Sequence, residues 1–187
     1  MFKKEIRVVG WDDASSPRAP GSEVTLIGAI TRGGGALDGV LSTKVTYDGL
    51  DATEKISRVI NNSRHKAQLR IIMTDGITFA GFNLVDIKEL YRATELPVIV
   101  VQRKMPNLKK FLSALKRFED YGERKTIVKH AGRIFRCGEI FFQKAGLTAS
   151  EAAEIIKLCT TRGNIPEPIR VAHLIATGLS GESKGRA

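Results

Sequence analysis

Three aspartates in this chain have the chemistry and the spacing of a metal site. Each of them follows a short apolar run that is typical of a β-strand, and they are Asp12, Asp48 and Asp75. Carboxylates that converge at one sheet edge repel each other unless a cation lies between them. Hard divalent cations such as Mg²⁺ prefer oxygen ligands and keep positions open for water and phosphate, and they promote phosphodiester hydrolysis. The three aspartates are therefore the predicted metal ligands.

A second interpretation of these acids is structural. Asp48-Gly49 and Asp75-Gly76 are common turn dipeptides, so each aspartate taken alone is more typical of a turn. It is their joint occurrence after three strands of a basic protein that favours a shared site. Asp13 is an alternative ligand to Asp12, and the strand register favours Asp12.

The elements that would position these acids are strands and helices in alternation. Strands are predicted over Ile6–Val9, Val24–Ile30, Val40–Tyr47, Leu69–Met73 and Pro97–Val101, with strand-like segments at Thr126–Val128 and Gly138–Phe142. Helices are predicted from Asp51 or Ala52, over Val85–Arg92 and Asn107–Phe118, after a cap at Thr148 or Ser150, and from Pro168. A three-strand antiparallel meander followed by parallel strands predicts an α/β fold, with a mixed sheet and helices on both faces. This is the arrangement of the ribonuclease-H-like core, parts of which are shared by other α/β folds.

Length and charge set further expectations. The 187 residues suit a single domain over residues 1–187, with a polar tail from about residue 180. Thirty basic against twenty acidic residues give a net charge of +10, which favours a nucleic-acid partner, although some proteins are basic for other reasons. We expect Lys109 and Lys110, in the basic middle of the chain, to contact phosphate. The apolar runs are too short to span a membrane and no signal peptide is visible, so we expect a cytoplasmic protein with reduced cysteines.

Five segments, in the same order along the chain, resemble the motifs of the endonuclease V family. They are Val8–Asp12, Tyr47–Leu50, Ile71–Gly76, Pro97–Lys104 and Ile165–His173. The last is similar to the family's Pro-x-Pro-x-Arg-x-Ala-His/Asp pattern and is the most specific of the five. Two longer matches, Asp38–Lys44 and Asp75–Asn83, resemble an archaeal branch of the family that was long uncharacterised and now bears the name endonuclease dU.

The resemblance implies a metal-dependent endonuclease that cuts DNA at or near a deaminated base, uracil or hypoxanthine, in DNA repair. It implies Mg²⁺ or Mn²⁺ as the cofactor, held by Asp12 and Asp75, with Asp48 where the family has a glutamate. His173 would be a fourth site residue. Either Arg103 or Lys104 would stabilise negative charge on the scissile phosphate.

Substrate contacts are expected just after the third aspartate. Gly76 and Phe79 are the candidates, with Phe79 stacking on a base that has left the helix; packing in the core is an equally good interpretation of Phe79. One alternative follows from departures at Asp48 and at Gly34–Gly39, which lacks the proline and aromatic residues of the family segment there: the protein would bind nucleic acid without cutting it. A separate alternative is a nuclease that acts on RNA, because net charge does not distinguish DNA from RNA.

Overall fold

A computed structural model describes residues 2–15 and 19–183, so the end of the predicted polar tail, residues 184–187, lies outside the described residues. Its strands are β1 (Arg7–Asp13), β2 (Glu23–Arg32), β3 (Leu37–Thr46), β4 (Ile71–Asp75), β5 (Thr78–Phe79), β6 (Asn83–Leu84), β7 (Val98–Gln102), β8 (Phe135–Cys137) and β9 (Ile140–Ala145). Its helices are α1 (Ala52–Asn61), α2 (Ile87–Thr94), α3 (Leu108–Leu115), α4 (Tyr121–His130), α5 (Ala149–Cys159) and α6 (Glu167–Gly178).

A seven-stranded mixed sheet organises the molecule, in the order β3-β2-β1-β4-β7-β9-β8. The first three strands form an antiparallel meander, and β1, β4 and β7 are mutually parallel. The last two strands are antiparallel to their neighbours. This topology confirms the predicted ribonuclease-H-like fold. It also brings the carboxyl ends of β1, β4 and β7 to one edge of the sheet.

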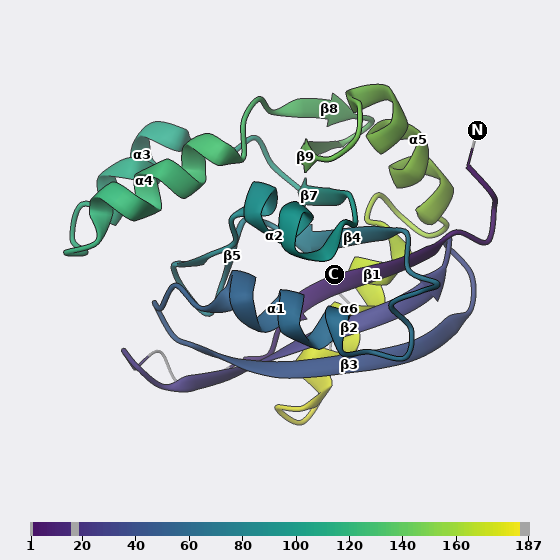
Figure 1. Ribbon diagram of the computed structural model, residues 1–187, viewed down its shortest axis with the longest axis horizontal. Helices are drawn as coiled ribbons and strands as arrows, with labels where there is room; N and C mark the ends of the chain where they lie inside the picture. Colours follow the sequence, from purple (N-terminus) through teal and green to yellow (C-terminus); the bar gives the residue numbers. More distant parts are fainter. Residues whose placement is uncertain (1, 16–18, 184–187) are drawn as a thin grey trace.

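Helices cover both faces of the sheet (Figure 1), as the buried apolar runs of the central strands require. Successive residues of a strand point to opposite faces. Val9 and Ile72 therefore pack on the side of α1 and α2, whereas Val8 and Ile71 pack on the side of α5. Helix α6 packs on this second side, beneath β1 and β2.

One predicted element is wrong. Thr126–Val128 was expected to be strand-like because its residues are β-branched, but it lies inside helix α4. The helix is stabilised by packing instead of propensity, because Ile127 and Val128 join a small core cluster that includes Leu84 and Leu115. Tertiary contacts of this kind override the intrinsic preference of a few residues.

The α3–α4 hairpin projects from the sheet at the end where β7 finishes (Figure 1). It is fixed by Arg124, whose side chain is almost fully buried. The guanidinium donates hydrogen bonds to the backbone carbonyls of Asp48 and Phe82 and pairs with Asp120 one turn earlier in α4. A buried arginine is tolerated because each of these acceptors compensates for its lost hydration.

Candidate metal and phosphate site

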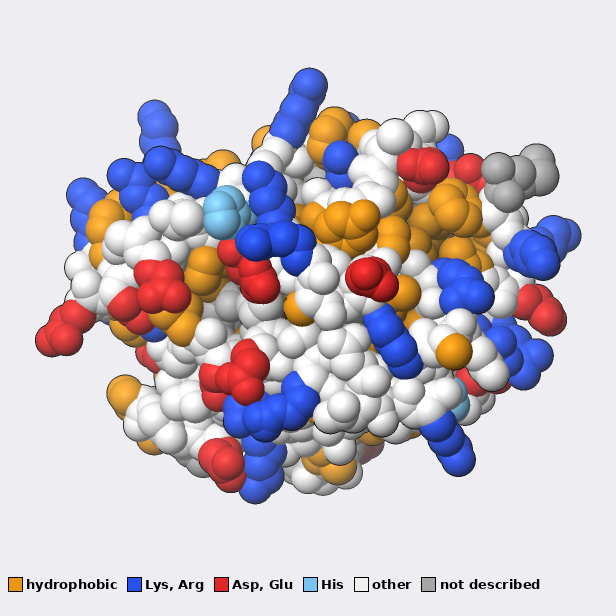
Figure 2. All heavy atoms as spheres, in the orientation of Figure 1, with side chains coloured by type: hydrophobic (Ala, Val, Ile, Leu, Met, Phe, Trp, Pro, Cys, Tyr) orange, Lys and Arg blue, Asp and Glu red, His pale blue; other side chains and the backbone are white. Residues whose placement is uncertain are grey.

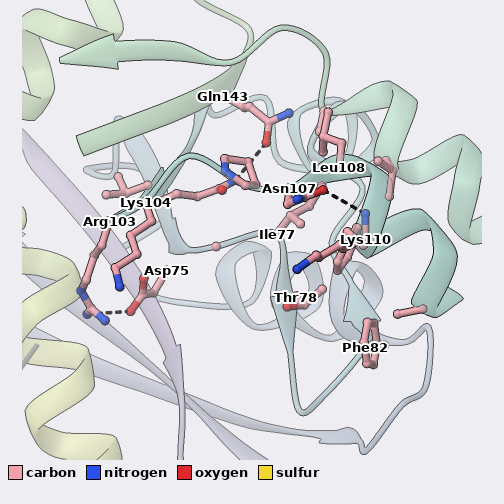
Figure 3. Close-up of a pocket in the computed structure, with 18 residues that line it drawn as sticks. Asp75, Ile77, Thr78, Phe82, Arg103, Lys104, Asn107, Leu108, Lys110 and Gln143 are labelled. Carbon is pink, nitrogen blue, oxygen red and sulfur yellow. Dashed lines mark hydrogen bonds and ion pairs between the residues drawn. The ribbon is translucent and has the colours of Figure 1, made fainter. Parts of the chain in front are cut away.

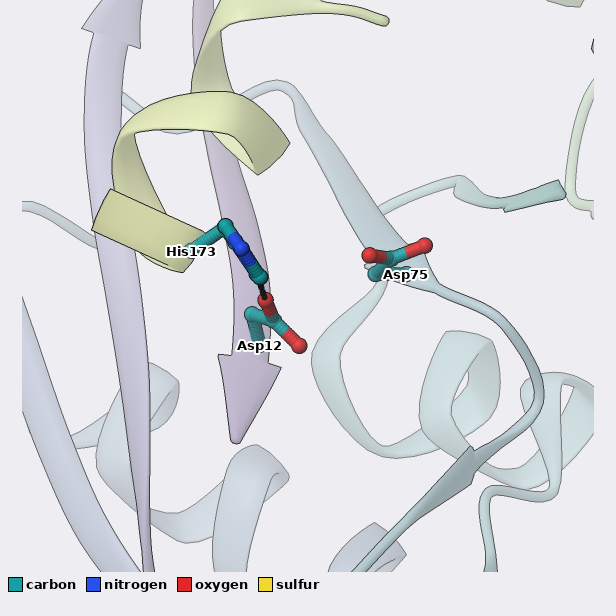
Figure 4. Close-up of side chains that lie close together, drawn as sticks. All are labelled: Asp12, Asp75 and His173. Carbon is teal, nitrogen blue, oxygen red and sulfur yellow. Dashed lines mark hydrogen bonds and ion pairs between the residues drawn. The ribbon is translucent and has the colours of Figure 1, made fainter. Parts of the chain in front are cut away.

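Two of the predicted acids and the predicted histidine meet at the carboxyl edge of the sheet. Asp12 lies next to the last residue of β1, Asp75 is the last residue of β4, and His173 lies on α6. The parallel register pairs Trp11 with Thr74, which sets the two aspartates side by side. One ligand atom from each residue lies within 4.8 Å of the others (Figure 4).

A glycine in β1 makes this meeting possible. Gly10 lies directly against the start of α6, and a methyl group there would collide with the carbonyl of Pro168. Because no side chain intervenes, α6 packs closely on β1 and its residue Ile169 is fully buried. Because α6 packs so closely on β1, His173, which lies just over one turn after Ile169, stands beside Asp12.

Asp12 orients His173. The Nδ1 atom of the ring and Oδ2 of the carboxylate are 2.7 Å apart. A carboxylate in this position fixes the ring and favours the tautomer that carries its proton on Nδ1. Nε2 is then the nitrogen that the ring offers to a metal ion or to a water molecule.

The two carboxylates are hard to ionise together. Burial, reinforced by the charge of Asp75, raises the pKa of Asp12 to about 7, although its hydrogen bond to His173 acts in the opposite direction. Burial also raises the pKa of Asp75, opposed by the nearby charge of Arg103. A divalent cation between the carboxylates would remove this repulsion. Carboxylate oxygens are ligands that suit Mg²⁺ or Mn²⁺, so the two aspartates fit such an ion.

Both predicted phosphate-binding residues border this cluster. Arg103 donates a 3.0 Å hydrogen bond to Oδ2 of Asp75 while part of its side chain stays exposed. Lys104 lines the same cavity as Asp75 and Lys110 (Figure 3). Lys109 is exposed on α3. Cationic groups therefore adjoin the carboxylates on the β7 and α3 side.

The structure does not bring Asp48 into the group of possible ligands that it forms among the described residues. The physical reason is topological: β3 is the outer strand, and β2 lies between it and β1. Asp48 lies in the turn after β3 with a φ of 58°. Its Oδ1 accepts a hydrogen bond from the backbone of Phe82, and its Oδ2 pairs with Arg117 at 3.2 Å. Its side chain is therefore engaged in holding a turn.

Phe79 was predicted to contact substrate, but only 1% of its surface is exposed and it packs within the main core. Its ring offers no free face to a base. Gly76, by contrast, lines the cavity beside Asp75. Phe82 also borders that cavity, where its ring stacks on Phe111 with centroids 5.8 Å apart.

The cavity itself was missed by sequence reasoning. It has a volume of about 740 Å³ and extends from Asp75 along β7 to α3 (Figure 3). Gln102, Asn107 and Gln143 supply polar groups to its wall. These residues come from three separate segments without a shared motif, so the sequence carries no signal that would group them.

Asp13 has a role that the sequence left open. Its Oδ2 accepts a 2.8 Å hydrogen bond from the backbone of Ala80. Ala80 in turn accepts, through its carbonyl, a hydrogen bond from the backbone of Asp48. Asp13 therefore anchors the turn between β5 and β6 beside the cluster.

A ribonuclease-H-like sheet with paired acids at the carboxyl ends of adjacent parallel strands is compatible with a nuclease. A family model described as Endonuclease dU matches residues 4–180, and the chain belongs to that family. The UPF0215 protein of Methanosarcina acetivorans is 52% identical over 193 residues, which cover 100% of this chain and 97% of the relative.

Solved structures share this fold. A protein of unknown function from Archaeoglobus fulgidus superposes with a TM-score of 0.87 at 42% identity, covering 92% of this chain and 97% of that one. Ciona intestinalis Endonuclease V, in complex with a 24mer DNA containing an inosine followed by a ribo-adenosine, superposes with a TM-score of 0.57 at 18% identity. That alignment covers 89% of this chain and 82% of the other, and it bears on the fold alone. Within the described residues, no helix has the length and apolar character needed to cross a membrane.

Proposed function

We propose that this protein is a divalent-metal-dependent endonuclease that hydrolyses a phosphodiester bond of DNA at or near a deaminated base, in DNA repair. The observation that carries the proposal is the convergence of Asp12, Asp75 and His173 within 4.8 Å in a chain of the Endonuclease dU family. The net charge of +10 supports a polyanionic substrate. Uracil is the favoured lesion because of the family's description, with hypoxanthine as the second candidate.

Asp12 and Asp75 would hold Mg²⁺ or Mn²⁺, which supplies Lewis acidity toward the phosphodiester. Asp12 keeps the imidazole of His173 in place, so that Nε2 can hold or accept a proton at the reacting phosphate. Asp48 is left out of this ligand set because its carboxylate is committed to Phe82 and Arg117.

Arg103 has a double role in this proposal. With no cation at the site, its guanidinium neutralises Asp75. Once a cation takes over that carboxylate, the guanidinium is available to the scissile phosphate, where fixed positive charge stabilises the transition state. Lys104 lies beside it in the cavity wall, and Lys109 and Lys110 would bind the neighbouring backbone phosphates.

The free cysteines agree with a cytoplasmic setting. We propose that the protein acts on DNA in the cytoplasm, where thiols remain reduced. Both cysteines are free. Burial raises the pKa of Cys159 to about 12, so this thiol is chemically inert.

The direct test is a cleavage assay on labelled duplexes that contain uracil, hypoxanthine or no lesion, with Mg²⁺, Mn²⁺ or EDTA. We expect nicks near the lesion that need the metal and disappear in Asp75→Asn. Metal binding is measured separately by titrating Mn²⁺ against the fluorescence of Trp11, the one tryptophan of the chain, which is buried next to Asp12.

The same assay separates the competing functions. Salt-sensitive binding with no cleavage of any substrate would replace the proposal with a non-catalytic binding protein. Cleavage of RNA alone, whether the RNA contains inosine or no lesion, would replace DNA with RNA as the substrate. Cleavage that persists in EDTA would remove the metal from the mechanism.

A further inference from the structure

Two large apolar side chains lie exposed beside the cavity. Met105 is 60% exposed and Leu108 is 40% exposed. Met105 lies in the connection between β7 and α3, and Leu108 is the first residue of α3; we refer to the two residues together as the apolar tip. Burying a side chain of this size stabilises by about 1.5 to 3 kcal/mol. An apolar pair beside a cavity is therefore suited to bury itself against a partner.

The surroundings of the apolar tip indicate which partner it contacts. Lys104 precedes it, Lys109 and Lys110 follow it, and the adjacent cavity begins at Asp75. Basic side chains gather over the α3–α4 end of the molecule, at the upper left of Figure 2. An apolar centre between cations complements a nucleic acid, which presents phosphates on the outside and stacked bases within.

The backbone that carries the apolar tip is also rigid. Pro106 lies between its two residues and restricts the backbone. Asn107 caps α3, because its side chain accepts a 3.0 Å hydrogen bond from the backbone of Lys110. A rigid backbone matters because side chains on a flexible segment would move away from the duplex instead of separating its stacked bases.

We propose that Met105 and Leu108 enter the base stack of a DNA duplex next to the scissile bond and hold open the place of a base that has turned into the cavity. The inference rests on the proposed function for the position of the scissile bond. Methionine and leucine are among the side chains that unstack a base step, which costs a few kcal/mol per step. A base that is already mispaired leaves the stack more easily.

The cavity can receive such a base. Its 740 Å³ lies within the range of small-molecule sites. Leu108 and Phe82 line it (Figure 3), together with Phe111, so one residue of the apolar tip is part of the cavity wall. Asp75 stands at the opposite end, where Arg103 and Lys104 extend toward it (Figure 3).

The first experiment compares two substrates that differ only in whether the base must be unstacked. Met105→Ser and Met105→Leu are assayed on a uracil-containing duplex and on the same lesion in a single strand. We expect Met105→Ser to lower duplex cleavage about ten-fold and to change single-strand cleavage less than about two-fold. Met105→Leu keeps a large apolar side chain, so we expect it to cleave the duplex at the rate of the unchanged protein. Equal losses on both substrates, or no loss on either, would overturn the inference.

The control variant is Leu37→Ser. Leu37 is 48% exposed and begins β3, whose other end approaches the carboxyl edge of the sheet. The Leu37→Ser variant therefore removes a comparable exposed apolar side chain at a distance from the cluster of Asp12, Asp75 and His173. We expect its ratio of duplex to single-strand cleavage to equal that of the unchanged protein, and an equal loss in this variant would refute the assignment to the apolar tip.

A second measurement separates failure of this inference from failure of the proposed function. Asp75→Asn, alone and combined with Met105→Ser, is bound to a duplex carrying 2-aminopurine next to the lesion, whose fluorescence rises on unstacking. A rise that depends on Met105 supports the inference even if no nuclease activity exists. Cleavage by the unchanged protein without a Met105-dependent rise, or no binding to duplex at all, refutes it.

Discussion

Two Asp-Gly pairs of the same local sequence have different roles in this molecule. Asp75-Gly76 ends a central parallel strand, and its carboxylate joins Asp12 and His173. Asp48-Gly49 follows the outer antiparallel strand, and its carboxylate holds the backbone of Phe82 and the side chain of Arg117. The position of a strand in the sheet therefore decides whether an acid at its end meets other possible ligands or holds a local turn.

The difference also explains the electrostatics of the two regions. Asp75 is set beside another buried carboxylate, and burial raises its pKa. Asp75 pairs with Arg103 and Asp48 pairs with Arg117, so both acids have a guanidinium partner. What distinguishes Asp75 is the second carboxylate beside it, whose repulsion a divalent cation would remove, whereas Asp48 accepts a hydrogen bond from the backbone of Phe82.

The largest expected effect comes from making the same substitution at both positions. Asp75→Asn removes a ligand charge, so we expect metal-dependent cleavage to fall roughly 100-fold or more. Asp48→Asn keeps an oxygen for the Phe82 backbone and a residue type that tolerates a φ of 58°. We expect its cleavage rate to stay within about two-fold of the unchanged protein. Initial rates on a uracil-containing duplex measure both.

The outcome that would reverse the comparison is a loss in Asp48→Asn as large as that in Asp75→Asn, with the Mn²⁺ affinity of both variants reduced. Asp48 would then be a ligand after all, as its place in the sequence motif predicted. Thermal unfolding of both variants serves as the control that each remains folded.

The next effect tests how the Asp75 region is assembled. Gly10→Ala places a methyl group against the Pro168 backbone, which cannot yield without moving α6. We expect a loss of about 3 kcal/mol in the free energy of unfolding, together with weaker Mn²⁺ binding. Urea titration and Trp11 fluorescence measure the two quantities. Full stability with unchanged Mn²⁺ affinity would show that α6 does not need this close approach.

How far the sequence predicts this protein is clear from the same residues. The strands, their order and the identity of Asp12, Asp75 and His173 as neighbours follow from apolar runs and a recognisable motif, because these elements depend on local patterns. The role of Asp48 depends on its contacts with Phe82 and Arg117, which are distant in the sequence and which no local pattern records. Phe79 shows the same limit, since its burial is decided by helices far away in the chain.

The α3–α4 hairpin was the least predictable region. Residues Thr126–Val128 favour a strand by composition, but they form a helix because Arg124 and Ile127 have buried partners elsewhere. The cavity beside the cluster depends on this hairpin, and so it was not visible in the sequence either. Regions whose structure depends on contacts between distant segments are where sequence reasoning stops.

A third prediction concerns the pH dependence of the metal-free protein. Because burial and Asp75 raise the pKa of Asp12 to about 7, the folded state binds a proton there that the unfolded state binds only near pH 4. The stabilising effect of this proton is complete below the pKa that Asp12 has in the unfolded chain, and it is lost as the pH rises through the folded-state pKa of about 7. We expect the free energy of unfolding in EDTA to increase by a few kcal/mol between pH 8 and pH 5.

Two controls sharpen that measurement. Asp12→Asn cannot ionise, so its unfolding free energy in EDTA should be higher at pH 8 and should vary much less over this range. Saturating Mn²⁺ should flatten the pH dependence between pH 5 and pH 7, because the ion replaces the proton between the carboxylates. A metal-free protein that is equally stable at pH 5 and pH 8 would contradict the raised pKa.

The smallest expected effect lies on the Asp48 side. Arg117→Ala removes the 3.2 Å ion pair with Asp48, but more than half of the arginine side chain is exposed, so water already solvates it well. We expect a loss of about 0.5 kcal/mol or less in unfolding free energy. The turn should persist, because the Phe82 backbone still donates to Asp48 and Arg124 still binds its carbonyl. Urea titration at low and high salt measures the difference, which should shrink with salt. A loss above about 2 kcal/mol would mean that the exposed cation, and not the buried hydrogen bonds, holds Asp48 away from the cluster.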